Sequence, residues 1–156
     1  MKRGILLMAL QVGIVLMTGA KYLTDRASLP RGWARVLPFD PNLPIRGRYV
    51  RLGLEVPLDG SLGSYGYVKL LSRMGQLRAV AADEDTGNSI WRRATPSGSR
   101  LSAPLAYFIP EHVPDPSQRA AGEELWVEVS IPRKGPPRPI RLAVKKADSF
   151  TVLPLD

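Results

Sequence analysis

An apolar segment near the amino terminus restricts the architecture of this chain more than any other feature of its sequence. It runs from Gly4 to Ala20, contains only two clearly polar side chains, and follows two cations. Seventeen residues at about 1.5 Å per residue form a helix of about 25 Å, slightly shorter than a hydrocarbon core of ~30 Å. Lys21 can lengthen the span by extending its ammonium group to the headgroups. We therefore expect one transmembrane helix, a signal anchor over residues 1–23, with residues 4–23 in the bilayer.

Two other interpretations of this segment stay open. A secretory signal peptide would be cut after Ala20, since Thr18 and Ala20 are small enough for the cleavage positions. The apolar run exceeds the ~7–15 residues of a signal-peptide core, which favours a retained anchor. A buried core helix would show a polar face, which this segment lacks. Cations flank both ends of the segment, so the distribution of positive charge does not decide its orientation in the membrane. The short amino-terminal tail favours an orientation in which the carboxyl-terminal part lies outside the cytoplasm.

Residues 24–43 are predicted to form a proline-rich tether between the helix and a folded domain. Prolines stand at positions 30, 38 and 41, and another follows at position 44. This density predicts neither a continued helix nor a central strand. Trp33 and Phe39 are candidate attachment points on the membrane interface or on the domain. For Phe39, covering an edge of the core is the simpler interpretation.

The remainder of the chain, residues 44–156, reads as one all-β domain. In residues 49–56 the apolar side chains alternate with the others in the two-residue period of a half-buried strand. A hairpin is expected at 67–71 and 77–81, joined by a turn at 73–76, and another turn is expected at 96–100. Further short strands are expected at 89–95, 105–110, 125–131, 140–146 and 149–155. Short strands separated by turns, without a long helix between them, predict a small antiparallel barrel or sandwich.

Composition narrows the function classes. The 15 prolines and 14 glycines favour short strands and turns. The chain has 22 Lys+Arg against 14 Asp+Glu, a net charge of +8, which favours attraction to anionic lipid headgroups or other polyanions. It has no cysteine, so a disulfide framework, a thiolate nucleophile and a thiolate metal site are excluded.

The segment "IRGRYVRLG" supplies a candidate ligand or partner surface, formed by Arg46, Gly47, Arg48, Tyr49 and Arg51. Tyr49 and Arg51 should project outward, and the two earlier arginines should lie at the rim of the inner face. This surface could contact lipid headgroups or an acidic protein, or be a solvated sheet face. Nucleic-acid binding would require several exposed aromatic rings among the cations, and we do not expect it.

Two loops contain titratable side chains but no complete catalytic or metal-binding set. Glu111 and His112 are adjacent, and they join the candidate surface residues. One imidazole and one carboxylate provide fewer ligands than a metal requires, and they lack the context of a nucleophilic triad. Residues 83–85, with the sequence DED, lack the alternating oxygen ligands of an EF-hand and favour a solvated turn. We expect no catalytic residue, metal or cofactor.

The order of several segments resembles a bacterial family of membrane-anchored proteins named for its GDYXXLXY motif. The segments are the basic start, the apolar anchor, "FDPNLPIRGRYVRLGLEV", "GYVKL", "LAYFIPE" and "ELWVEVSI". Gly47, Tyr49 and Leu52 match the motif. Arg48 stands where the family has aspartate, and Leu54 where it has the last tyrosine. The resemblance therefore implies no metal-binding or salt-bridge role at position 48, because this chain has no carboxylate there.

The resemblance implies a single-pass protein of the bacterial cytoplasmic membrane, with an extracytoplasmic β domain and a polytopic membrane protein as partner. We expect a non-enzymatic envelope interaction protein. The alternative is a domain that binds or hydrolyses an envelope polysaccharide or lipid through Glu111, His112 and nearby arginines. A purely structural accessory subunit is a third candidate.

Overall fold

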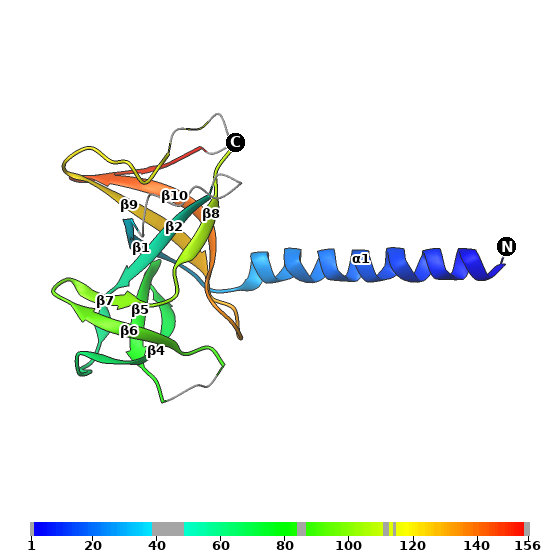
Figure 1. Cartoon of the computed structure of the whole chain (residues 1–156), viewed down its shortest axis with the longest axis horizontal. Helices are drawn as coiled ribbons and strands as arrows, with labels where there is room; N and C mark the ends of the chain where they lie inside the picture. Colours follow the sequence, from blue (N-terminus) through cyan, green and yellow to red (C-terminus); the bar gives the residue numbers. More distant parts are fainter. Residues whose placement is uncertain (1, 39–48, 84–86, 111–112, 114, 155–156) are drawn as a thin grey trace.

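The computed structural model describes residues 2–38, 49–83, 87–110, 113 and 115–154. It consists of one long helix that projects from a β domain (Figure 1). The predicted fold class is confirmed, because the domain contains a closed barrel with additional strands and one apolar helix precedes it.

Helix α1 (Lys2–Ser28) contains the predicted span. Its segment Gly4–Asp25 is long and apolar enough to cross a bilayer, and none of it is buried against the rest of the chain. This exposure contradicts the buried core helix. The Thr18 hydroxyl donates a 2.8 Å hydrogen bond to the carbonyl of Ile14, so one polar group of the span is satisfied within the helix. The helix continues past its predicted end at Leu23.

The prediction of a tether over residues 24–43 is wrong for most of residues 24–38, the part of this segment that the structure describes. Strand β1 (Arg31–Pro38) follows α1 after two residues. It is a central strand, antiparallel to β2 (Tyr49–Val56) and to β9 (Glu123–Ser130). Its prolines do not interrupt it, because Pro30 precedes the strand and Pro38 is its last residue, where proline is tolerated.

Six strands form the closed barrel. Around the barrel, β1 and β2 are followed by the strands β7 (Gly98–Leu101), β6 (Ile90–Thr95), β4 (Tyr65–Arg73) and β5 (Gln76–Ala81). Neighbours along this order are antiparallel. The barrel closes where β5 meets β1 in parallel, with Trp33 opposite Gln76.

Gly32 permits this closure. A Cβ atom at position 32 would lie 2.9 Å from the backbone nitrogen of Leu77. The next residue, Trp33, donates a 2.9 Å backbone hydrogen bond to the carbonyl of Gly75. Glycine is therefore required for the close approach of the two backbones.

The additional strands extend the sheet beyond the barrel. On the other edge of β1, β9 is followed by β10 (Arg138–Lys146) and β11 (Ser149–Val152) (Figure 1). Strand β8 (Leu105–Phe108) pairs with β2, and the short β3 (Leu58–Asp59) pairs with β5. The predicted strand at 149–155 is thus found beside β10.

The hydrophobic core fills the barrel and continues under β9 and β10. The predicted inward side of β2 is confirmed, since Val50, Leu52, Leu54 and Val56 are all buried. Other strands contribute Ala34, Val36, Val68, Leu70, Leu77, Ala79, Ile90, Leu101, Leu105, Leu125, Val127, Val129 and Leu142, and Ile109 follows β8.

Two local predictions differ from the structure. The turn predicted at 96–100 is shorter, because β7 begins at Gly98, where φ is +148° and a Cβ would lie 2.7 Å from the Val56 carbonyl oxygen. In β10 the register shifts between Pro139 and Arg141. Farther along the strand, Leu142 and Ala143 are both buried, so the predicted strict alternation fails.

Candidate functional site

A groove lies where α1 joins the β domain, and we call it the helix–barrel groove. Its volume is about 1010 Å³. The end of α1, the Leu29–Pro30 connection, the end of β4, Asn88 and the loop between β9 and β10 line it. In Figure 1 the loop between β9 and β10 lies on the side of the domain from which α1 leaves.

Backbone hydrogen bonds hold the walls of the groove together. The amide of Ile131 donates to the carbonyl of Pro30 at 2.9 Å, which ties the end of β9 to the residue before β1. The amide of Gly135 donates to the carbonyl of Gly87 at 3.1 Å, which ties the β9–β10 loop to the segment before β6. The groove is therefore a fixed feature of the fold, although its walls come from distant parts of the sequence.

Arg138, the first residue of β10, lies at the contact between helix and domain. The central carbon of its guanidinium group is 5.6 Å from the centroid of the Tyr22 ring, a cation–π arrangement. Arg138 and Tyr22 also line two smaller hollows of about 240 and 390 Å³. Arg138 is thus shared by all three hollows along the helix–domain junction.

The charge of the helix–barrel groove is strongly positive. Lys21, Arg133, Lys134 and Arg138 line it, and Asp25 is the one carboxylate among its lining residues. All four cations are exposed. Within the described part of the chain, none of the four forms an ion pair with a carboxylate. The groove therefore presents unneutralised charge to a ligand.

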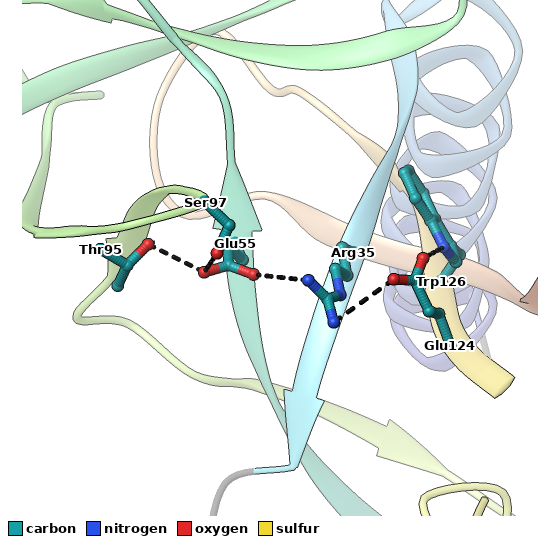
Figure 2. A network of polar contacts seen from close by, with 6 residues as sticks. All are labelled: Arg35, Glu55, Thr95, Ser97, Glu124 and Trp126. Atoms are coloured by element: carbon teal, nitrogen blue, oxygen red, sulfur yellow. Dashed lines mark hydrogen bonds and ion pairs between the residues drawn. The ribbon is translucent and has the colours of Figure 1, made fainter. Parts of the chain in front are cut away.

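A second polar feature crosses the outer side of the sheet (Figure 2). Glu55 is only 5% exposed, and its Oε1 accepts hydrogen bonds from the hydroxyls of Thr95 at 2.8 Å and Ser97 at 2.7 Å. Its Oε2 forms an ion pair of 3.5 Å with Nη1 of Arg35 but accepts no hydrogen bond. On its other side, Arg35 Nη2 lies 3.3 Å from Oε1 of Glu124.

This network is structural. Arg35 lies between the carboxylates of Glu55 and Glu124, and two hydroxyls occupy the remaining oxygen of Glu55 (Figure 2). A pair of carboxylates for glycoside chemistry must instead flank the bond to be cleaved. The network joins the β6–β7 turn, β2, β1 and β9, so it holds the barrel to the additional strands.

A third feature is an aromatic surface on the outer side of β4 and β6. The rings of Tyr65 and Trp91 are nearly parallel, with centroids 6.4 Å apart, and Tyr67 meets Trp91 edge-on at 5.0 Å. The guanidinium of Arg93 lies 5.6 Å from the Tyr65 ring centroid. Tyr65 and Trp91 are both exposed.

The residues predicted as a ligand surface do not line the helix–barrel groove where they are described. Tyr49 pairs with Phe108 of β8, and their ring centroids are 6.1 Å apart. Arg51 lies two residues farther along β2, opposite Ala106. The other predicted residues, Arg46, Gly47, Arg48, Glu111 and His112, lie outside the described residues.

Other sequence-based candidates are also placed. Trp33 attaches to the domain, since its ring meets Phe150 edge-on at 4.9 Å. Phe39 lies outside the described residues. Asp83 is exposed, and its neighbours Glu84 and Asp85 lie in an undescribed segment. Among the described residues, no group of three or more His, Asp or Glu side chains is arranged to hold a metal ion.

A scan against protein-family models finds no match for this chain. Searches among curated proteins and among solved structures also find none. The resemblance to the GDYXXLXY family therefore stays a prediction.

The sequence contained a signal for the groove that its interpretation missed. The "PRKGPPRP" segment, residues 132–139, lies between the strands predicted at 125–131 and 140–146 and places three of the four groove cations within six residues. The fourth, Lys21, stands at the predicted membrane exit. Their proximity depends on the pairing of β9 with β1, which no local pattern encodes.

Proposed function

We propose that this protein is a non-enzymatic interaction protein of the bacterial cell envelope. In this proposal α1 anchors it in the cytoplasmic membrane, the barrel lies outside the cytoplasm, and the barrel binds a polytopic membrane protein. The observation that carries the proposal is the short connection between span and barrel. Two residues separate α1 from β1, so the barrel stays within reach of the membrane surface.

The exposed helix supports the first part of the proposal. Apolar side chains face outward along the whole Gly4–Asp25 segment. In water this surface would be unfavourable at roughly 25 cal/mol per Å², whereas a bilayer covers it on all sides. A protein held in this way meets other membrane proteins by diffusion in two dimensions, and its helix-side surfaces are the first to contact them.

The anchor is tested by the intact mass of the chain purified from bacterial membranes, together with protease digestion of spheroplasts. We expect a mass that retains Met1 or Lys2, and digestion of the barrel from outside while a cytoplasmic control protein stays intact. A mass that begins at Lys21, with recovery in the soluble fraction, would show a cleaved signal peptide and contradict the anchor. Protection of the barrel in spheroplasts would contradict its orientation.

The partner is tested by site-specific photo-crosslinking in intact cells. A photoreactive residue at Arg133, on the helix side of the barrel, should give one reproducible product with an integral membrane protein. The same residue at Ser97, in the exposed β6–β7 turn, is the matched control and should not give it. Copurification that yields no membrane protein beyond those found with an unrelated single-span protein would count against the proposal.

An envelope polysaccharide is a second candidate ligand, and the aromatic surface of β4 and β6 favours it. Exposed, nearly parallel rings such as Tyr65 and Trp91 offer flat apolar faces to the apolar face of a sugar ring. Sedimentation of the full chain with insoluble cell-wall polysaccharide tests this ligand. Trp91→Ala should abolish cosedimentation, while Trp126→Ala, on a different part of the sheet, should leave it unchanged.

A further inference from the structure

We propose that the helix–barrel groove binds the headgroup of an anionic phospholipid from the leaflet next to the barrel. The inference deepens the proposed function and rests on its first part, the retention of α1 as a membrane span. It concerns the cations Lys21, Arg133, Lys134 and Arg138 and the space of about 1010 Å³ between them and the barrel.

The position of the groove along the helix matches the depth of the lipid headgroups. With the Gly4–Asp25 segment centred in the bilayer, Lys21 lies about 10 Å and Ser28 about 20 Å from the midplane at ~1.5 Å per residue. The hydrocarbon core ends about 15 Å from the midplane, and the headgroup region ends at roughly 20–22 Å. Both residues line the groove, which therefore extends from the outer part of the hydrocarbon core, where the Lys21 side chain can reach outward, through the headgroup layer.

The cations of the groove suit a phosphate group. Arg133, Lys134 and Arg138 come from one side and Lys21 from the helix side. Arginine can donate two parallel hydrogen bonds to phosphate oxygens, and lysine adds a compact charge. Because the four cations form no ion pair within the described residues, a phosphate would not have to displace a carboxylate.

The uncharged part of the lining suits the rest of a lipid. Leu29, Leu71 and Ile131 contribute apolar side chains next to the cations. Leu71 is 43% exposed although its strand belongs to the barrel. Apolar groups beside the phosphate site can contact the glycerol backbone and the first methylene groups of the acyl chains. A free phosphate ion would leave this surface in water.

The groove does not need to be assembled when the lipid arrives. The hydrogen bonds from Ile131 to Pro30 and from Gly135 to Gly87 already fix its walls, and the Tyr22–Arg138 contact fixes the helix against β10. A preformed site loses little conformational entropy on binding.

The experiment measures lipid binding to the full chain in detergent micelles by native mass spectrometry, with phosphatidylglycerol or phosphatidylcholine added at equal concentrations. We expect the unmodified chain to prefer phosphatidylglycerol. In a variant with Arg133→Gln, Lys134→Gln and Arg138→Gln this preference should fall about tenfold or more, since each surface cation contributes several-fold to anionic-lipid binding. The matched control removes the same charge from outer strand positions, through Lys69→Gln, Arg93→Gln and Lys145→Gln, and should keep the preference.

Equal binding of the two lipids, or equal losses in the two variants, would overturn the proposal. Displacement of the lipid by glycerol phosphate at comparable concentration would also overturn it, because the ligand would then be a free anion. Binding of an oligoglutamate peptide without binding of phosphatidylglycerol would overturn it too, because the ligand would then be an acidic protein segment. Unchanged circular dichroism and melting temperature exclude misfolding, since the substituted side chains are exposed except for the half-buried Lys69. Failure of the anchor is recognised separately, by a mass that begins at Lys21.

Discussion

Arg35 of β1 and Glu55 of β2 lie opposite each other in register, with Nη1 of the guanidinium 3.5 Å from Oε2 of the carboxylate. Arg35 is partly exposed, whereas Glu55 is buried and also accepts hydrogen bonds from Thr95 and Ser97. A single carboxylate thus holds the β6–β7 turn against the central strands. Removal of this group would leave the two hydroxyls without this acceptor, while Arg35 would keep its ion pair with Glu124.

Glu55→Ala should therefore lower the free energy of unfolding by about 2–3 kcal/mol, because hydrogen bonds to charged groups contribute about 1.5–3 kcal/mol and their loss leaves polar groups unpaired. Glu123→Ala is the matched control. Glu123 pairs with the exposed Lys146 at 3.3 Å, and loss of a surface pair should cost less than about 1 kcal/mol. Urea denaturation of the full chain in mild detergent measures both, and equal losses would contradict the structural role of Glu55.

The barrel closure at Gly32 gives a second prediction. Gly32→Ala should destabilise the protein by about 1–3 kcal/mol, since its Cβ would meet the backbone nitrogen of Leu77 and push β5 away from β1. At Gly63 an added Cβ meets no atom within 4 Å, so Gly63→Ala should be neutral or stabilise by about 0.4–1 kcal/mol. Melting temperatures of the two variants test this difference, and a stable Gly32→Ala protein would refute the closure.

The Tyr22–Arg138 contact should restrict the angle between helix and barrel. The chain has no cysteine, so spin labels can be placed at Leu10 and Ala147 without further substitutions. Tyr22→Ala should broaden the distance distribution between the labels in lipid nanodiscs, because a cation–π contact worth about 0.5–1 kcal/mol is lost.

The control for this measurement is Tyr65→Ala, which removes an equivalent contact within the barrel, where Arg93 lies 5.6 Å from the ring centroid. It should leave the distance distribution unchanged. A distribution that is equally narrow in all three proteins would show that the hydrogen bond from Ile131 to Pro30 fixes the angle without help from Tyr22.

Arg92 is only 1% exposed, and it pairs with no carboxylate among the described residues. Its Nη1 donates to the Ser99 hydroxyl at 3.4 Å, Nη2 donates to the Gly63 carbonyl, and Nε has no partner. Because burying an uncompensated charge is costly, Arg92→Met should change stability by less than about 2 kcal/mol. Arg92→Ala should cost about 2–5 kcal/mol through the cavity it leaves.

Thermal unfolding of the two Arg92 variants distinguishes packing from charge. A loss in Arg92→Met as large as that in Arg92→Ala would show that the guanidinium itself is required. The long aliphatic part of the side chain would then contribute little to the packing of the barrel.

The features predicted correctly depend on local patterns. Val50, Leu52, Leu54 and Val56 alternate with other residues, and the same alternation places them in the core. The turn between β4 and β5 follows from the Gly75 position between two alternating segments. The side-chain period identifies the inward face of β2, although Gly53 and Glu55 on the other face are buried as well.

The features that were missed depend on exact position and on distant pairing. The density of prolines suggested a tether, but their positions at the ends of β1 leave its ladder intact. The helix–barrel groove combines Lys21 with Arg133 and Lys134, more than one hundred residues later in the sequence. Hydrophobic periodicity contains no information about which distant strands pair, so the charge cluster could not be assembled from the sequence.

The pairing of β1 has a consequence for biosynthesis. The first strand to follow the helix is hydrogen-bonded to β9, which the ribosome makes more than eighty residues later. The central strand therefore waits, with one edge unpaired, until β9 has been produced. With α1 as the proposed membrane span, two residues before β1, that edge would wait at the membrane surface, where an unpaired strand is a route to aggregation.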